Sequence, residues 1–486
     1  MKFISTRGAE KVTGAEVVLK GIAANGGLFV PEKFPAVTEG ELDEMCEMSY
    51  AERVAKIISK FFPEFNGEEL LHACEEAYSK FGVADAAPLV RLDDGVYMLE
   101  LFHGTTCSYK DMSTVTLACL AEKATDKNKL LLTDSAESGK SAMEIFKDRE
   151  NYSVLAFYPT ENISKMQKLQ LGIQDGSNVL SVAVKGSADD CQNAVKDAFL
   201  NEEIKSASEG KTCPVIVNSL NFGVIVPQIA YYFSAYLDLL SSEQIEKGEE
   251  VDFCVPCGNF SNAVSAYYAK KIGLPIRRIH CAVNDNNALA DFFKSGEYDA
   301  QRELLKTTSP SMDTLFSANF ERVLFEISGR DYRLISKRMT ALREEGKFTV
   351  TEEELKQINE IFDCGSATEE TCVEAMYDVF VDTGYTMDTH TGCAMKVAVD
   401  WFEKNKKDET KMVIVAVANP YKFPQDVLYA VTGNDVKDSF KGIKRLHAAT
   451  AMAVPKCLKD LRDKPLRFTL SIDKKKVSEE ILNYIK

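Results

Sequence analysis

Apolar and polar positions along this chain form blocks that predict strands and helices in alternation. From residue 101 onward, short apolar runs bounded by turn residues are typical of buried strands, and the stretches between them carry apolar residues at helical spacing. This rhythm predicts an α/β protein with parallel sheets covered on both faces. The predicted strands are 129–133, 153–158, 179–184, 214–218, 251–256 and 277–283.

The same pattern divides the chain into three expected units. A length of 486 residues allows two or three domains. The N-terminal stretch carries two helical patterns, at 50–62 and 68–81, and we interpret it as a packing module. The polar and charged stretch 241–250 is expected to link two αβ halves. The three expected units are 1–92, 93–245 and 246–486.

Charge and composition exclude some classes of binding partner and of cellular location. The formal net charge of −16 argues against nucleic acid or an anionic membrane surface as a partner. No apolar run approaches a membrane span, and the first five residues lack the apolar core of a signal peptide, so we expect a cytoplasmic protein. The thirteen cysteines are scattered, and the one close pair, Cys254 and Cys257, lacks further ligands, so no metal site is predicted.

One lysine stands at a chemically suggestive place. The stretch 101–111 lies between an apolar run at 96–102 and a helical pattern at 113–123, which puts Lys110 on the turn from strand to helix. Backbone N–H groups and the positive end of the helix dipole disfavour a charged ammonium there. A free lysine amine can attack a carbonyl and form a Schiff base. Most lysines, however, are solvated surface charges, so spacing alone does not decide the role.

Three other strand-to-helix turns carry groups suited to anions. Backbone amides and hydroxyls at a helix N-terminus favour phosphate or carboxylate. In parallel sheets such turns lie beyond the carboxyl ends of the strands, where ligands bind. The turns are 134–140, 158–167 and 256–262.

The residue sequences of these segments, and their order along the chain, resemble those of the threonine synthase family. His103-Gly-Thr-Thr-Cys-Ser-Tyr-Lys-Asp111 is similar to the family's cofactor-lysine segment, His-Gly-Pro-Thr-x-x-Phe-Lys-Asp. Residues 258–262 resemble its phosphate loop, Gly-Asn-Phe-Gly-Asn, and the likeness runs in order from Phe3 to Phe423. It implies a pyridoxal-phosphate enzyme of the tryptophan-synthase-β fold type (fold type II), with two parallel-sheet αβα domains and a small N-terminal extension.

The resemblance also implies the members of the site. Lys110 would hold pyridoxal 5'-phosphate and act as the catalytic base, and no metal is implied. The implied cofactor-binding residues, besides Lys110, are Gly258, Asn259, Phe260, Ser261, Asn262 and Asn419. The implied substrate-binding residues are Ser135, Ser138, Gly139, Lys140, Ser164, Lys165, Asn218 and Asn221.

Four residues depart from the family pattern where ligands should bind. Asp134 replaces a threonine and adds an anion, unless Lys140 or another cation pairs with it, and it also suits a helix N-cap. Val224 replaces an arginine, which removes a bidentate donor. Ser261 replaces a glycine and could still donate to phosphate. Val417 replaces a threonine that faces the pyridine nitrogen, so Asn419, water or nothing takes its place.

The resemblance implies a lyase that converts O-phospho-L-homoserine and water to L-threonine and phosphate, acting on a small amino-acid phosphate as a monomer or homodimer. The four departures leave two alternatives open. One is a threonine-synthase-like paralogue with another amino-acid substrate, or one that stops at elimination as a phospholyase. The other is a pyridoxal-phosphate-binding protein with weak catalysis or none.

Overall fold

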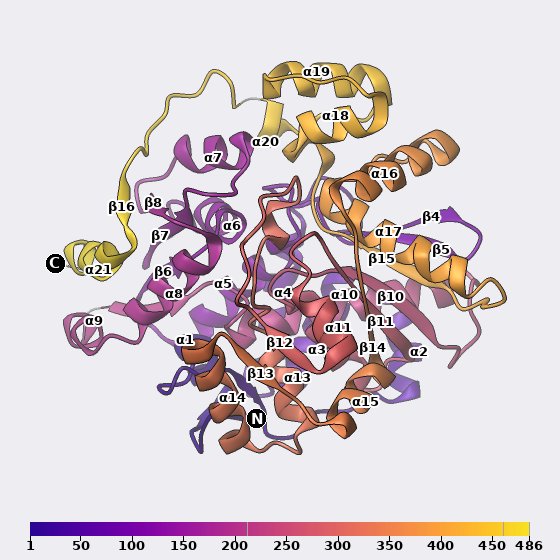
Figure 1. Cartoon of the computed structure of the whole chain (residues 1–486). Helices are drawn as coiled ribbons and strands as arrows, with labels where there is room; N and C mark the ends of the chain where they lie inside the picture. Colours follow the sequence, from indigo (N-terminus) through magenta and orange to yellow (C-terminus); the bar gives the residue numbers. More distant parts are fainter. Residues whose placement is uncertain (211, 460, 486) are drawn as a thin grey trace.

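Two parallel sheets form the frame of the molecule (Figure 1). The computed structural model describes residues 1–210, 212–459 and 461–485. The five-stranded sheet, parallel throughout, has the order β16 (Ser471–Asp473), β8 (Val179–Lys185), β7 (Tyr152–Pro159), β6 (Asn128–Thr133) and β9 (Thr212–Ile216). The six-stranded sheet has the order β14 (Phe362–Ser366), β11 (Ile276–Val283), β10 (Val251–Pro256), β15 (Met412–Ala416), β5 (Val96–Glu100) and β4 (Leu89–Asp93).

The α/β prediction is confirmed, because all six predicted strands form within two residues of their expected ends. Within the described strands of these two sheets, only β4, at the edge of the larger sheet, runs antiparallel to its neighbour. The apolar runs are buried on both faces, as parallel strands between two helical layers should be. The pattern of apolar positions therefore identified the strands correctly.

Strand pairing crosses both ends of the expected 93–245 unit. The expected boundary at residue 92 falls inside β4, which pairs with β5 just after it, and β5 also pairs with the much later strand β15. Near the other end of the chain, β16 and helix α21 (Val477–Ile485) return to the five-stranded sheet, where β16 pairs with β8. Figure 1 shows this yellow C-terminal segment lying against the purple sheet. The periodicity of apolar positions predicts where strands lie but not which strands pair. The pairings of β5 with β15 and of β8 with β16 were therefore not predicted.

Helix α10 (Phe222–Ser241) lies at the centre of the molecule and has apolar residues on all sides. A helix of that kind must be buried on every face. It packs against α3 (Tyr50–Phe61) of the N-terminal module, against α5 (Lys110–Ala124), and against α11 (Ser261–Lys271) beside the larger sheet. The N-terminal module is therefore part of the same core as the two sheets.

The N-terminal module contains a small antiparallel sheet in the order β2 (Lys11–Thr13), β1 (Lys2–Ser5) and β3 (Phe29–Pro31). The helices expected at 50–62 and 68–81 form as α3 and α4 (Gly67–Tyr78). No helix among the described residues is long and apolar enough to cross a bilayer.

The other elements cover the two sheets or connect their strands. They are α1 (Gly14–Lys20), α2 (Glu39–Cys46), α6 (Ala136–Phe146), α7 (Lys165–Gly172), α8 (Ala188–Phe199), α9 (Glu202–Ser208), α12 (Ala288–Ser295), β12 (Glu297–Asp299), η1 (Pro310–Met312), α13 (Phe320–Ile327), α14 (Tyr332–Glu345), β13 (Lys347–Thr349), α15 (Glu352–Ile361), α16 (Glu369–Thr383), α17 (Thr389–Lys404), η2 (Pro420–Lys422), α18 (Pro424–Thr432), α19 (Ser439–Thr450), α20 (Lys456–Lys459) and η3 (Lys474–Lys476).

The larger sheet contains a buried charge cluster around His280. The Nε2 atom of His280 lies 3.1 Å from Asp252, and its Nδ1 atom lies 3.4 Å from Asp363. Arg277 also binds Asp252. Burial of His280 opposes its charged form, but hydrogen bonds with the two carboxylates outweigh that effect and raise the pKa of His280.

We expect this cluster to make stability depend on pH. A pKa raised by folding contributes stability that is complete below the unfolded pKa of about 6.5 and is lost as pH rises through the folded pKa. Urea unfolding between about pH 6 and pH 9 should therefore show a falling free energy of unfolding. His280→Asn should lose this dependence, and identical pH profiles for the two proteins would contradict the assignment.

Candidate active site

Lys110 is the first residue of α5, and its side chain lines a cavity between the two sheets with only 8% of its surface exposed. The segment after β15 fixes the approach to this lysine. The N–H of Tyr109 donates to the carbonyl of Val417 at 2.9 Å, and the N–H of Asn419 donates to the carbonyl of Cys107 at 3.1 Å. The Nζ atom of Lys110 lies 4.6 Å from the centroid of the Tyr109 ring. The predicted strand–turn–helix placement of this lysine is thus present.

The loop before Lys110 is rigid because of Asp111. The buried carboxylate of Asp111 accepts hydrogen bonds of 2.7 Å from the N–H and the hydroxyl of Thr106, and another of 2.7 Å from the hydroxyl of Ser141. A Cβ atom at Gly104 would lie 2.5 Å from the Asp111 side chain, so only glycine fits there. The Gly and Asp of this motif therefore fix the direction of the lysine.

The loop Gly258–Asn262 crosses the cavity opposite Lys110 and leads into α11. Phe260 precedes the helix with a φ of 65° and provides no side-chain cap. The hydroxyl of Ser261 is buried and has no hydrogen-bond partner among the described residues. A Cβ at Gly258 would lie 2.4 Å from the carbonyl oxygen of Ser311. The N–H of Ser261 donates to the Asn259 side chain at 3.1 Å, and the unpartnered Ser261 hydroxyl at this helix N-terminus fits a phosphate group.

The turn at residues 134–138 forms a third wall of the cavity. Ser135 caps α6 by accepting a hydrogen bond of 3.3 Å from the N–H of Ser138. Asp134 is buried and accepts a hydrogen bond from the side-chain amide of Asn218. Burial raises the pKa of Asp134, and the Asn218 amide and the charge of Lys110 oppose the rise. Lys140, which the sequence offered as one cation that could pair with Asp134, instead binds Glu144 at 3.0 Å.

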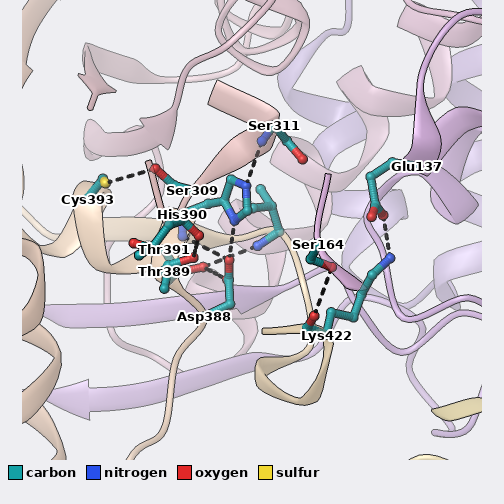
Figure 2. Close-up of polar contacts among 12 residues, drawn as sticks. Glu137, Ser164, Ser309, Ser311, Asp388, Thr389, His390, Thr391, Cys393 and Lys422 are labelled. Carbon is teal, nitrogen blue, oxygen red and sulfur yellow. Dashed lines mark hydrogen bonds and ion pairs between the residues drawn. The ribbon is translucent and has the colours of Figure 1, made fainter. Parts of the chain in front are cut away.

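A buried ion pair lies beside this turn, as Figure 2 shows. The Nζ atom of Lys422 lies 2.5 Å from Glu137, which also accepts a 2.6 Å hydrogen bond from Gln167. Burial raises the pKa of Glu137, but the Lys422 ammonium outweighs it and the net pKa is lowered. Sequence reasoning did not identify Glu137, because its partner lies 285 positions away.

His390 connects the cavity to the start of α17 (Figure 2). Its Nδ1 atom lies 2.8 Å from Asp388, and its Nε2 atom accepts the N–H of Ser311 at 3.1 Å. Because Nε2 accepts, we assign the proton to Nδ1 and a neutral ring. Thr391 also donates to Asp388. This network holds Ser311 against Gly258, and sequence reasoning assigned no role to His390.

Nine of the predicted site residues meet in this one cavity. They are Lys110, Ser135, Ser138, Asn218, Gly258, Asn259, Phe260, Ser261 and Asn262. Val417 and Asp134, two of the four departures, line it as well. No group of three or more His, Cys, Asp or Glu side chains in the described ranges is arranged to hold a metal ion.

Three predicted substrate-binding residues on α6 and α7 lie outside the cavity lining. Gly139 packs beneath it, where a Cβ would lie 3.1 Å from Ala156. Lys140 binds Glu144 at 3.0 Å and faces a second cavity. Ser164 caps α7 by accepting the N–H of Gln167 at 3.1 Å.

Three further predicted residues are also engaged elsewhere. Lys165 is exposed, and its Nζ donates to the carbonyl of Lys437 at 3.3 Å. The side-chain amide of Asn221 donates to the backbone carbonyls of Val18 in α1 and Ile216 at the end of β9. The Asn419 side chain accepts the N–H of Tyr421 at 3.1 Å and faces the second cavity, so it is not positioned to replace the missing threonine hydroxyl.

Val224 lies in the apolar core within α10 and does not line the cavity. An arginine there would place a charge where 3% of the present side chain is exposed. We expect Val224→Arg to lower the free energy of unfolding by about 3–5 kcal/mol, as other uncompensated buried charges do. Urea unfolding would measure this loss, with Val224→Ile as a nearly volume-matched control. Wild-type stability in the arginine variant would mean that the guanidinium reaches solvent or an anion.

The fold and the cavity define an enzyme of the tryptophan-synthase-β fold type, with a lysine at a helix start facing a phosphate-type loop. Residues 2–78 match the family model of the threonine synthase N terminus, and residues 391–481 match the model of the threonine synthase C-terminal part. The chain is 31% identical over 439 residues to the threonine synthase of Pseudomonas aeruginosa, covering 89% of this chain and 91% of that one. The chain belongs to the threonine synthase family.

A solved structure and a second group of relatives are also similar to this chain. The crystal structure of pyridoxal-phosphate-bound threonine synthase from Brucella melitensis superposes with a TM-score of 0.86 at 31% identity and covers both chains completely. Threonine synthase-like 1 of Homo sapiens is 32% identical over 462 residues, which is 90% of this chain. The chain spans 62% of the length of that relative.

Proposed function

We propose that this enzyme binds pyridoxal 5'-phosphate at Lys110 and converts O-phospho-L-homoserine and water to L-threonine and phosphate. The observation that carries the proposal is the meeting of Lys110, the Gly258–Asn262 loop and the Ser135–Ser138 turn in one cavity. The cofactor-bound state of the Brucella melitensis relative supports the choice of cofactor.

Each wall of the cavity then has a task. The Ser261 hydroxyl and the amides that begin α11 hold the cofactor phosphate. Ser135 and Ser138 offer their hydroxyl groups to the substrate carboxylate, while the N–H of Ser138 stays bound to Ser135 as the helix cap. The cofactor supplies an electron sink for carbanion charge at the substrate.

Lys110 carries the proton transfers of the proposed reaction. Its Nζ is the one lysine amine that lines the cavity in the described chain, so it removes and returns protons at the substrate α and β carbons. Phosphate leaves from the γ carbon, and water adds at the β carbon. Burial of Lys110 and the surrounding walls keeps bulk water from competing for these protons.

Asp134 favours keeping a second candidate function. The Asp134 carboxylate lies in the cavity wall and accepts a hydrogen bond from the Asn218 amide. The cation that acts on its pKa is Lys110, the lysine proposed to hold the cofactor. A substrate with two anionic ends is therefore less well accommodated than in the full family pattern. A paralogue that uses another amino acid, or one that stops at elimination, fits this charge distribution. A pyridoxal-phosphate-binding protein with weak catalysis is the remaining candidate.

Substitution of Asp134 tests whether O-phospho-L-homoserine is the substrate. Two unit charges at about 4 Å interact by about 4 kcal/mol at an effective dielectric near 20, and a quarter of that changes affinity about fivefold. We expect Asp134→Thr to raise kcat/KM for O-phospho-L-homoserine about fivefold, with Asp134→Asn as the isosteric neutral control. Release of phosphate and formation of threonine are measured together.

The outcomes separate the candidates. Threonine formed with phosphate supports the proposed reaction. Phosphate released with a keto acid, and without threonine, would indicate elimination only. Absence of both products, together with an unchanged cofactor spectrum on adding substrate, would exclude O-phospho-L-homoserine as the substrate.

We further propose that the enzyme acts in the cytoplasm as a monomer or homodimer. Thirteen cysteines without a disulfide suit a reducing compartment. Analytical ultracentrifugation distinguishes the two oligomeric states.

A further inference from the structure

A second cavity of about 1040 Å³ lies behind the cofactor-lysine loop. One side of this loop, at Tyr109 and Lys110, faces the active-site cavity. The other side, at 103–105 and Cys107, faces the second cavity. Another wall of the second cavity comes from a later segment of the chain, which includes Thr450, Met452, Pro455, Cys457 in α20, Leu461 and Lys464. The second cavity therefore touches the active site through one short loop.

Two thiols meet across this cavity. The Sγ atoms of Cys107 and Cys457 lie 3.2 Å apart, although the residues are 350 positions apart in the chain. Cys107 is 3% exposed and has a φ of 62°, a conformation unusual outside glycine. Hydrogen bonds from its N–H to Gly104 and from the N–H of Asn419 to its carbonyl maintain that conformation. The backbone that positions Lys110 thus also fixes the Cys107 side of this contact.

The surroundings make one of the two thiols reactive. The hydrogen bond from the Cys107 thiol lowers the pKa of Cys457, and together with the charges of Lys422 and Lys140 it outweighs the opposing effects of burial and of Asp111. The same contact raises the pKa of Cys107. A thiolate is the nucleophile in thiol oxidation, and Cys457 is partly exposed at a large cavity. The pair thus combines a reactive thiol, a resolving thiol and a path for a small oxidant.

We propose that Cys107 and Cys457 form a reversible disulfide when a hydroperoxide enters the second cavity. The Cys457 thiolate attacks the peroxide oxygen, which breaks the O–O bond and leaves a sulfenic acid and hydroxide. Cys107 then attacks that sulfur, forms the S–S bond and releases water. In total, two thiols and one hydrogen peroxide give one disulfide and two waters.

The disulfide changes the cofactor-lysine loop. Its sulfurs must approach from 3.2 Å to about 2.05 Å, and Cys107 lies three residues before Lys110. A displacement of about 1 Å at a reacting group costs as much as about a hundredfold in rate. The oxidised enzyme is therefore expected to turn over up to about a hundredfold more slowly and to recover when dithiothreitol reduces the bond. This consequence rests on the proposed function, whereas disulfide formation itself does not.

The chain offers a matched control pair. Cys372 and Cys393 also approach closely, with 3.8 Å between their sulfurs. Neither lines the second cavity, although Cys372 borders a separate cavity of about 640 Å³. The contact with Cys393 and burial raise the pKa of Cys372, whereas the pKa of Cys457 is lowered. If proximity alone decided oxidation, both pairs would react. If access and a reactive thiol decide it, only the Cys107–Cys457 pair will.

The experiment treats the full-length, cofactor-loaded protein with hydrogen peroxide and maps disulfides by mass spectrometry. We expect a peptide that links Cys107 to Cys457, is lost on reduction and is absent in Cys457→Ser, while Cys372 and Cys393 stay reduced. A Cys107→Ser variant should instead accumulate oxidised Cys457. Retention of both thiols in the wild type, or equal oxidation of the control pair, would overturn the proposal even if the enzyme is active.

Discussion

Replacement of Lys110 by alanine should lower turnover by about 10⁴-fold, the upper range for loss of an acid–base group. Lys110 is the one lysine of the described chain whose side chain lines the active-site cavity. The substitution removes both the covalent attachment of the cofactor and the group that moves protons. It should leave the fold intact, because the backbone of the loop is held by Asp111 and by the segment after β15.

Two measurements check the role of Lys110. Borohydride reduction followed by peptide mapping should place the cofactor on Lys110, and the yellow colour of the purified enzyme should weaken in Lys110→Ala. Lys140→Ala and Lys165→Ala are controls, because one lysine faces the second cavity and the other is exposed. Finding the label on Lys140 or Lys165 would show that the cofactor binds elsewhere.

Ser261→Asp should weaken cofactor binding by about a thousandfold. The Ser261 hydroxyl is buried without a partner at the start of α11. A carboxylate there would meet the cofactor phosphate at a few ångströms. One pair of like charges at about 4 Å costs about 4 kcal/mol at an effective dielectric near 20, which corresponds to about 10³ in affinity.

Titration of the protein with pyridoxal phosphate, followed by absorbance, measures that loss. Ser261→Ala is the matched control and should cost about tenfold, since it removes one hydrogen bond to a charged group. Asn259→Asp tests the same loop from a residue whose amide donates to Ser219 at 2.8 Å. If Ser261→Asp keeps wild-type affinity, the phosphate lies outside this loop.

The positions of Lys110 and of the phosphate-type loop were predictable from the sequence because they depend on residues nearby in the chain. Lys110 and Gly258–Asn262 follow apolar runs and open helices, so the strand–turn–helix geometry was readable from the residues around them. Lys140 shows the limit of that reasoning. It lies two residues after Ser138, which is about 200° around a helix, so the two side chains face different cavities.

Contacts between distant segments were not predictable from one sequence. The Glu137–Lys422 ion pair joins residues 285 positions apart, and no local pattern selects one lysine out of many as the partner. The role of His390 depends on the N–H of Ser311, a backbone group that every sequence contains. Val224 was expected near the ligand from its motif, yet the buried face of α10 holds it in the core.

Because late strands pair with early ones, the two large sheets cannot be completed until late in translation. β5 leads into the lysine loop but pairs with β15, which leaves the ribosome more than 300 residues later. β8 likewise waits for β16 near the C-terminus before its outer edge is covered. Until then an open strand edge invites pairing with other chains. The nascent protein therefore depends on two late segments, on β15 to complete the candidate active site and on β16 to cover the edge of the five-stranded sheet.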